Sequence, residues 1–171
     1  MSLVIVIHKF NEKADVSYLD LLRETFRREI RLARLLEKDQ GKEKAHELIY
    51  RCHVNDDLEL VSRQLKGKKT LESFEKFKTL MKRLHENPAA RKMFTITYPI
   101  DNDEMIVFLT KECILAEVFK EMKAEDLGYI MCCQPDFETT PAYCPNVYLK
   151  RSKTLMKGDD HCDTTYCWKK Q

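Results

Sequence analysis

The sequence predicts an α+β fold in which a helical N-terminal half packs on a small, mainly antiparallel sheet formed by the C-terminal half. Two patterns carry this prediction. Across residues 14–86, apolar residues recur every three to four positions, as in amphipathic helices. Across residues 93–168, alternating and β-branched stretches are separated by turn residues, which indicates a mixed sheet with one helix. We expect both layers to form a single domain over residues 1–171, because this length suits one sizeable core.

Three helices are predicted in the first half, and capping or breaking residues set their ends. They span residues 18–40, 42–66 and 71–86. Ser17 is the expected N-cap of the first helix, and residues 53–57 are expected to interrupt or kink the second. The arginines along the first helix alternate with glutamates, so we interpret them as a solvated face.

After the third helix, the spacing of apolar residues changes to the two-residue repeat of β-strands. Residues 93–98 are β-branched, aromatic and alternating, and residues 104–109 read as their antiparallel partner after a turn. Thr110 is expected to cap a following helix, which would place Cys113 in the first turn of that helix. There the helix dipole would lower the pKa of the thiol. The alternative is a buried cysteine at a strand–helix junction.

The last quarter of the chain, from Leu127 to Trp168, holds most of the reactive side chains. Residues 129–132 fit either a buried strand or the end of a helix, and residues 137–145 fit a loop or a short helix. Residues 146–152 and 160–168 alternate and are predicted strands. The rest of the chain would then serve to bring this region together.

Strand alternation divides the final reactive run. On a strand, His161 and Asp163 point to one side and Cys162 to the other, so these three cannot form a triad alone. A thiolate attacks an electrophilic carbon when a neighbour takes its proton. Cys162 therefore needs a base from elsewhere, and Asp136 is the candidate. Cys133 lies three residues before Asp136 and is the second candidate thiol.

The same side chains have an alternative interpretation as zinc ligands, because cysteine, histidine and carboxylate bind zinc in tetrahedral sites. The candidate ligands are Cys113, Cys133 and Cys162, with Asp136 or His161. Their spacing is not that of a zinc finger, since Cys132 and Cys133 are adjacent. We therefore predict no metal and no cofactor, and keep zinc as the alternative.

The composition excludes several classes of partner. The 30 Lys and Arg residues nearly balance 28 Asp and Glu residues, so a net charge of +2 indicates no nucleic-acid or membrane partner. The apolar run at residues 3–7 is too short for a signal peptide or a membrane span. Seven cysteines without a secretion signal argue against a disulfide framework and favour the cytoplasm. We expect a small-molecule substrate, and a homo-oligomer is a further expectation.

Three segments resemble the L-2-amino-thiazoline-4-carboxylic acid hydrolase family. They are residues 110–119, 128–136 and 149–163, and the last contains the run Leu-x-Arg-x-Lys-Thr-Leu-x-x-Gly-Asp-Asp-x-Cys-Asp. The resemblance is clearest over roughly residues 94–163, while the helical half fits the family's layout without a specific motif. Thr164 and Thr165 stand where the family pattern has an aromatic and often a basic residue, which affects the expected shape of the pocket.

The resemblance implies hydrolysis of a small cyclic amidine, L-2-amino-thiazoline-4-carboxylate, to N-carbamoyl-L-cysteine. Water or an enzyme thiolate would add to the carbon between the ring sulfur and nitrogen, and the ring thiolate would leave. Cys133 or Cys162 would serve as the nucleophile, Asp136 as the general base, and Asp163 would orient a partner or the amidine.

The substrate-binding residues implied by the resemblance are Arg151 or Lys153 for the carboxylate, with Cys113 and His161 nearby. One alternative is a non-catalytic domain that binds a small molecule or a metal with the same cysteines. Another is an interaction protein that uses the helical half, which predicts a large exposed apolar face within residues 14–86.

Overall fold

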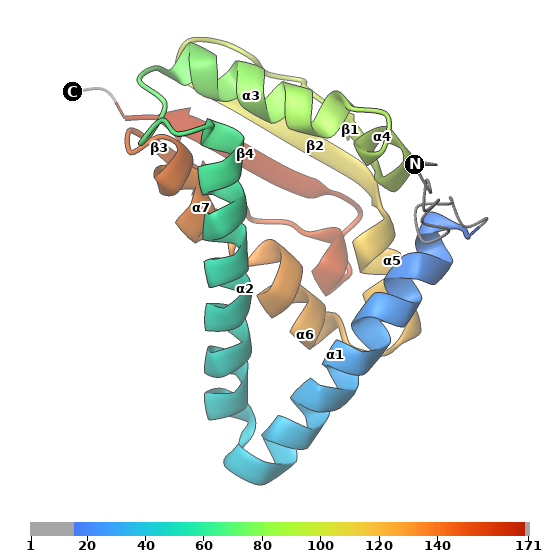
Figure 1. Cartoon of the computed structure of the whole chain (residues 1–171). Helices are drawn as coiled ribbons and strands as arrows, with labels where there is room; N and C mark the ends of the chain where they lie inside the picture. Colours follow the sequence, from blue (N-terminus) through green and yellow to red (C-terminus); the bar gives the residue numbers. More distant parts are fainter. Residues whose placement is uncertain (1–15, 170–171) are drawn as a thin grey trace, which may run out of the picture.

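The computed structural model of the protein describes residues 16–169, so the apolar run at residues 3–7 lies outside the described residues. Two long helices form an open V, and a four-stranded sheet with shorter helices closes its wide end (Figure 1). The long helices are α1 (Tyr18–Gln40) and α2 (Lys42–Leu65). The predicted α+β fold, with a helical first half and an antiparallel sheet in the second, is confirmed.

The ends of α1 and α2 follow from their capping residues. The side chain of Ser17 accepts the N–H of Asp20, as the sequence predicts for an N-cap. Gly41 links the two helices with a φ of 85°, a conformation that glycine adopts without strain. The kink predicted at residues 53–57 is wrong: α2 is continuous there, because this segment contains neither proline nor glycine.

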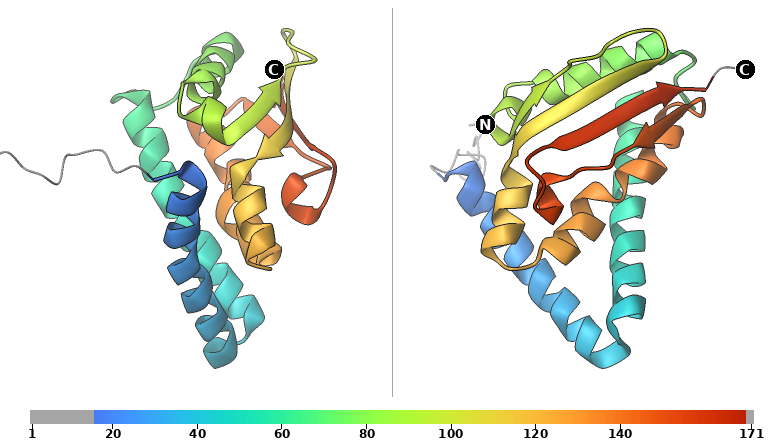
Figure 2. Two further views of the ribbon diagram at one scale, coloured as in Figure 1. Left: turned by 90° about the vertical axis from the view of Figure 1, so that its right-hand side faces the viewer. Right: turned by 180° about the vertical axis from the view of Figure 1, so that it is seen from behind.

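Helix α3 (Phe74–Glu86) begins three residues later than predicted. Its N-cap is Ser73, whose side chain accepts the N–H of Lys76, while Leu71 instead donates its N–H to the carbonyl of Tyr143 at 2.7 Å. The helix ends at Asn87 as expected and is followed by the short helix α4 (Ala90–Met93). Figure 2 shows α3 lying along the sheet.

The sheet has the order β1-β2-β4-β3, and all of its pairs are antiparallel. Its strands are β1 (Phe94–Thr97), β2 (Met105–Cys113), β3 (Val147–Lys150) and β4 (Cys162–Trp168). Strand β2 is longer than predicted, since it pairs along both edges. Thr110 therefore does not cap a helix but pairs with Cys162, and the next helix, α5 (Ile114–Glu121), starts four residues later.

All secondary-structure elements between α5 and β3 are helices. These are α6 (Glu125–Gly128), the π-helix η2 (Tyr129–Cys133) and α7 (Asp136–Tyr143). Pro135 lacks an N–H and its ring clashes with the carbonyl four residues back, so a regular helix cannot run through it. The wide turn before it is closed by a bond of 2.8 Å from Gln134 N to Tyr129 O.

Two apolar clusters hold the layers together. In the first, the rings of Phe77 on α3 and Phe108 on β2 both contact Tyr166 on β4, with centroids 5.1 and 5.3 Å apart. The second joins α1, α5 and α6 to the one-turn 3₁₀-helix η3 (Leu155–Lys157), where Phe26 of α1 packs on Phe119 at 4.7 Å.

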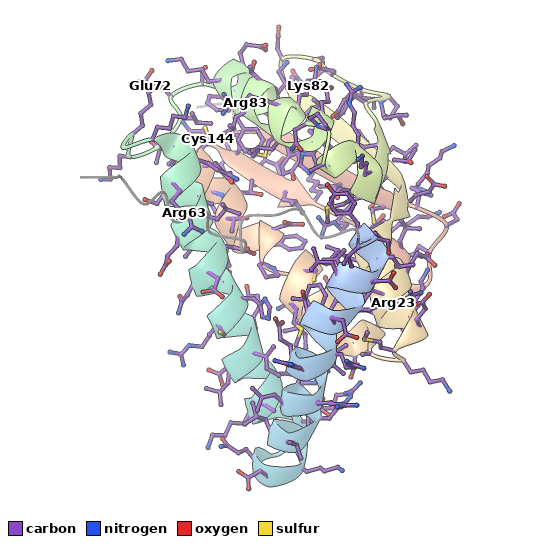
Figure 3. All side chains as sticks on the ribbon, turned by 45° about the vertical axis from the view of Figure 1, so that its right-hand side comes forward. Arg23, Arg63, Glu72, Lys82, Arg83 and Cys144 are labelled. Carbon is purple, nitrogen blue, oxygen red and sulfur yellow. The ribbon has the colours of Figure 1, made fainter. Side chains whose placement is uncertain are left out.

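Charged pairs add to the attachment of α1. Arg23, labelled in Figure 3, donates to both carboxylate oxygens of Glu121 on α5, at 2.7 and 2.8 Å. Arg34 similarly binds Asp126 on α6. Within residues 16–169, no helix combines the length and apolar character needed to cross a membrane.

Candidate active site in a thiol-lined cavity

A cavity of about 320 Å³ lies between one face of the sheet, helix α2 and the η2–α7 segment. The sheet register determines which side chains line it. Phe108 pairs with Thr164 and Thr110 pairs with Cys162, and side chains two residues apart on a strand share a face. Cys162, Thr164 and Tyr166 therefore point to the same side, as alternation predicts, and all three line the cavity.

The cavity has an apolar end and a polar end. The apolar end is formed by Leu84, Ile96 and Phe108, which also belong to the first apolar cluster. The polar end combines thiols, carboxylates, hydroxyls and one guanidinium. Such a division suits a small ligand whose ring or alkyl part is buried while its polar groups are held by a few directed contacts.

Four cysteines line the cavity and come from three separate segments. Cys113 ends β2, Cys132 and Cys133 end the π-helix, and Cys162 begins β4. All four are free thiols. The structure thus brings together Cys113, Cys133 and Cys162, which the sequence places on different elements, and adds Cys132.

Cys113 does not have the environment expected from the sequence. It is the N-cap of α5 rather than a member of its first turn, and burial raises the pKa of its thiol. The backbone N–H groups of Ala116 and Leu115 act in the opposite direction but do not outweigh burial. The predicted lowering of the Cys113 pKa is therefore wrong, and the alternative of a buried cysteine at a strand–helix junction fits.

Cys132 and Cys133 are also held as neutral thiols. Burial raises the pKa of Cys133 to about 12, against opposing contributions from Arg151 and Thr154. Burial also raises the pKa of Cys132 well above its ordinary value. Neither thiol is poised as a thiolate at neutral pH, which makes both poor nucleophiles.

Cys162 has more directed contacts. Its sulfur accepts the backbone N–H of Leu155 at 3.3 Å, and its thiol donates to the hydroxyl of Thr154 at 3.6 Å. The same hydroxyl lies 3.9 Å from the sulfur of Cys133. Thr154 thus connects the two thiols proposed as nucleophile. Sequence reasoning missed its role, although it lies within the Lys-Thr-Leu part of the motif at residues 149–163.

Arg151 organises the polar end. Its guanidinium donates to Asp136 Oδ2 at 2.5 Å, to the carbonyl of Cys133 at 2.8 Å and to the hydroxyl of Thr164 at 2.9 Å. Burial alone would lower the pKa of Arg151, but the charge and hydrogen bond of Asp136 outweigh it and raise the pKa. Arg151 is therefore a buried, charged residue tied to three elements.

The carbonyl of Cys133 is available to Arg151 because of the helix break. In a regular helix this carbonyl would accept the N–H of Phe137, four residues on. Beyond Pro135, however, Phe137 donates to Gln134 at 3.2 Å instead. The proline thus places Asp136 at the start of α7 and frees a carbonyl beside it, and Arg151 binds both.

Asp57 on α2 is a carboxyl that the sequence interpretation missed. It lines the polar end of the cavity, and burial, followed by the charge of Asp136, raises its pKa. A signal was present: Asp57, Val61 and Leu65 are spaced by four residues, so Asp57 falls on the inward stripe of the helix. An ionisable residue on such a stripe indicates either a paired charge or a site.

Two tyrosines complete this end. The hydroxyl of Tyr143 donates to Gln64, and burial, aided by Asp57 and Asp136, raises the pKa of Tyr143 to about 12. Burial also raises the pKa of Tyr166. Both hydroxyls stay protonated at neutral pH and can donate hydrogen bonds.

Three residues expected at the site lie outside the cavity. The carboxylate of Asp163 accepts the backbone N–H groups of Ser152 and Lys153, each at 2.8 Å, and so holds the loop after β3 against β4. Lys153 and His161 both pair with Asp160, at 3.3 and 2.8 Å. Asp163 follows Cys162 directly on β4 and therefore points to the opposite side of the strand.

The cysteines do not form the compact group that one metal ion requires. Over residues 16–169, one set of three His, Cys, Asp or Glu residues has its ligand atoms within 4.8 Å of one another: Glu37, His46 and Asp126. This set lies between α1, α2 and α6, away from the cavity. Arg34 binds both of its carboxylates, which already supplies the positive charge a cation would bring.

Comparison with known proteins gives a matching family model and solved structures of similar fold. The family model described as L-2-amino-thiazoline-4-carboxylic acid hydrolase matches residues 13–166. No curated protein matches the chain. Among solved structures, the phenol-responsive sensory domain of the transcription activator PoxR, with phenol, is similar at a TM-score of 0.51. The two share 15% sequence identity over 92% of this chain and 77% of that chain, a likeness of fold.

Proposed function

The chain belongs to the L-2-amino-thiazoline-4-carboxylic acid hydrolase family, and we propose that its cavity hydrolyses a small cyclic amidine of the 2-aminothiazoline class. The observation that carries the proposal is that one cavity collects a hydrogen-bonded thiol, a carboxylate bound to arginine and a second carboxyl of raised pKa. These are the nucleophile, base and acid that ring opening requires.

In the first step, the sulfur of Cys162 adds to the carbon between the ring sulfur and nitrogen, and the thiol proton passes to the ring nitrogen. The carbon–sulfur bond of the ring then breaks. The ring sulfur leaves as a thiolate and takes the proton of Asp57, which gives an isothiouronium on Cys162. Asp57 is placed in this role because it lines the cavity and because burial, followed by the charge of Asp136, raises its pKa.

In the second step, water adds to the isothiouronium carbon and gives one proton to Asp136. The adduct collapses to the carbamoyl group, Cys162 leaves, and the remaining hydroxyl proton returns to its sulfur. Transfer of the proton from Asp136 to Asp57 restores the starting state. The net reaction consumes one water and yields one free thiol on the product.

Arg151 is proposed as the residue that orients Asp136 and receives the substrate carboxylate. Three of its N–H groups are used by Asp136, Cys133 and Thr164, and a guanidinium has further donors. Lys153 does not fit this role, because it lies outside the cavity and pairs with Asp160.

A second candidate is a non-catalytic domain that binds a small molecule. It is favoured by the apolar end of the cavity, by the neutral state of Cys113, Cys132 and Cys133, and by the shared fold with a sensory domain solved with phenol. In this case the polar end would recognise a ligand through Arg151 and Tyr166 without turnover.

Steady-state turnover of L-2-amino-thiazoline-4-carboxylate distinguishes the two functions. We expect product from the wild-type protein, and a loss of at least about a hundredfold in kcat for Cys162→Ala, Asp136→Asn and Asp57→Asn. Cys52→Ala, at an exposed position on α2, is the matched control and should keep full activity. Absence of product, with a melting temperature raised by the same compound, would establish the binding function instead.

A further inference from the structure

Helix α1 carries a second apolar stripe that faces away from its own core. Its inward stripe includes Ile30 and Ala33, which are buried. On the opposite side, Leu21, Leu32 and Leu35 are 55, 59 and 63% exposed. Single exposed leucines are ordinary, but three on one face of a helix indicate a surface for another protein. The helix itself lies at the outer edge of the molecule (Figure 2).

The spacing of the stripe is that of a coiled-coil seam. Successive positions are three and four residues apart, and the seam consists of Tyr18, Leu21, Thr25, Arg28, Leu32 and Leu35. Both ends of the seam are apolar and its middle is polar. A polar position inside such a seam disfavours other registers and so selects one pairing.

We propose that α1 pairs antiparallel with α1 of a second copy of this chain, about a two-fold axis near Phe26 and Arg27. In a two-fold interface, each contact occurs twice with the partners exchanged. This pairing sets Leu21 against the partner's Leu32 and Tyr18 against the partner's Leu35. Thr25 then lies opposite the partner's Arg28, so apolar residues meet apolar ones and polar residues meet polar ones.

The charges beside the seam complement each other in the same register. Glu24 and Arg31 lie along one edge of the seam and are both exposed. The antiparallel pairing places Glu24 near the partner's Arg31, and Arg31 near the partner's Glu24. Within one chain, Glu24 also pairs with Arg27, but exposed pairs of this kind contribute little and exchange readily.

A parallel pairing fits these residues less well. It would bring Arg28 against the partner's Arg28 inside the seam, and Glu24 beside the partner's Glu29 at its edge. Both juxtapositions place like charges together. The pattern therefore favours the antiparallel dimer over the parallel one.

Sedimentation equilibrium of the full chain tests the apolar part of the surface. We expect a dimer for the wild-type protein and a monomer for Leu32→Glu, with an unchanged circular dichroism spectrum. The control is Leu60→Glu, since Leu60 is an exposed leucine of α2 at 41% and lies outside the seam. It should leave the dimer intact.

Charge exchange tests the register and does not depend on Leu32→Glu folding. Glu24→Arg alone and Arg31→Glu alone should each weaken dimerisation by at least about tenfold, because like charges then face each other twice. Mixing the two variants should restore a dimer containing one chain of each, and the double variant Glu24→Arg/Arg31→Glu should dimerise by itself.

Three results would overturn the inference. A monomeric wild-type protein at all concentrations would do so, as would a dimer that Leu32→Glu leaves unchanged. Failure of the mixed charge variants to recover association would show that the pairing is not antiparallel through α1.

Discussion

Arg151 donates a hydrogen bond of 2.5 Å to Asp136, from a side chain that is 8% exposed to a carboxylate that is 40% exposed. The arginine comes from the end of β3 and the aspartate from the start of α7. The buried cation therefore fixes a carboxylate that still meets solvent and the cavity. A carboxylate that is held in place yet accessible suits the proposed activation of water.

Arg151→Ala should destabilise the protein by about 2 kcal/mol, because it leaves the carbonyl of Cys133 and the hydroxyl of Thr164 without their donor. Urea unfolding followed by circular dichroism measures this change. The matched control is Arg51→Ala on the exposed side of α2, which should change stability by less than about 0.5 kcal/mol. Equal effects of the two variants would contradict the proposed organisation of the polar end.

Thiol labelling should separate the cysteines by environment. With a pKa of about 12 instead of 9.0, Cys133 has roughly a thousandfold less thiolate at neutral pH than an ordinary cysteine. Iodoacetamide at neutral pH, read by mass spectrometry, should therefore modify the exposed Cys52 quickly, and Cys113, Cys132 and Cys133 slowly. Fast modification of Cys133 in the folded protein would contradict its neutral, buried state.

Stability should fall at alkaline pH. Burial raises the folded-state pKa of Cys133 and of Tyr143 to about 12, above their ordinary values of 9.0 and 10.0. For acids with a raised pKa, the contribution to stability is complete below the unfolded value and is lost as pH rises through the folded one. Urea midpoints should drop between about pH 9 and pH 12, and less steeply for Cys133→Ala. Parallel curves for both proteins would rule out this role of Cys133.

Gly128→Ala should destabilise the packing beneath the cavity. A Cβ at this position would lie 2.6 Å from both Met156 Sδ and Phe119 Cγ. The methionine can move but the ring cannot, so we expect a loss of about 1–3 kcal/mol. Adding Met156→Ala should recover part of this loss, which a double-mutant cycle by chemical denaturation would reveal. Strict additivity of the two changes would show that Met156 takes no part in the clash.

Much of the fold could be predicted because periodicity reports burial directly. Apolar side chains are buried away from water, and their positions produce the stripes of α1 and α3 and the alternation around Thr164. Where a predicted boundary of a helix or strand was wrong, the cause is local. Thr110 resembles a helix cap, but pairing of β2 with two neighbours extends the strand through it.

The site was only partly predictable, since it is built across elements. Strand alternation predicts Cys162 on one face and His161 and Asp163 on the other. His161 and Asp163 were still predicted as site residues, because they belong to the same family motif as Cys162. Asp57 was missed because a polar stretch on α2 resembles a break in the helix. The wide turn before Pro135, which exposes a carbonyl to Arg151, depends on tertiary contacts that a linear sequence does not display.

We propose that this cavity opens the ring of a cyclic amidine. Carbon-13 NMR of L-2-amino-thiazoline-4-carboxylate, labelled at the carbon between sulfur and nitrogen, tests it most directly. With protein in excess, the amidine signal should be replaced by a carbamoyl signal, and Asp136→Asn should abolish this conversion. An amidine signal that shifts on binding but never converts in the wild-type protein would contradict the claim.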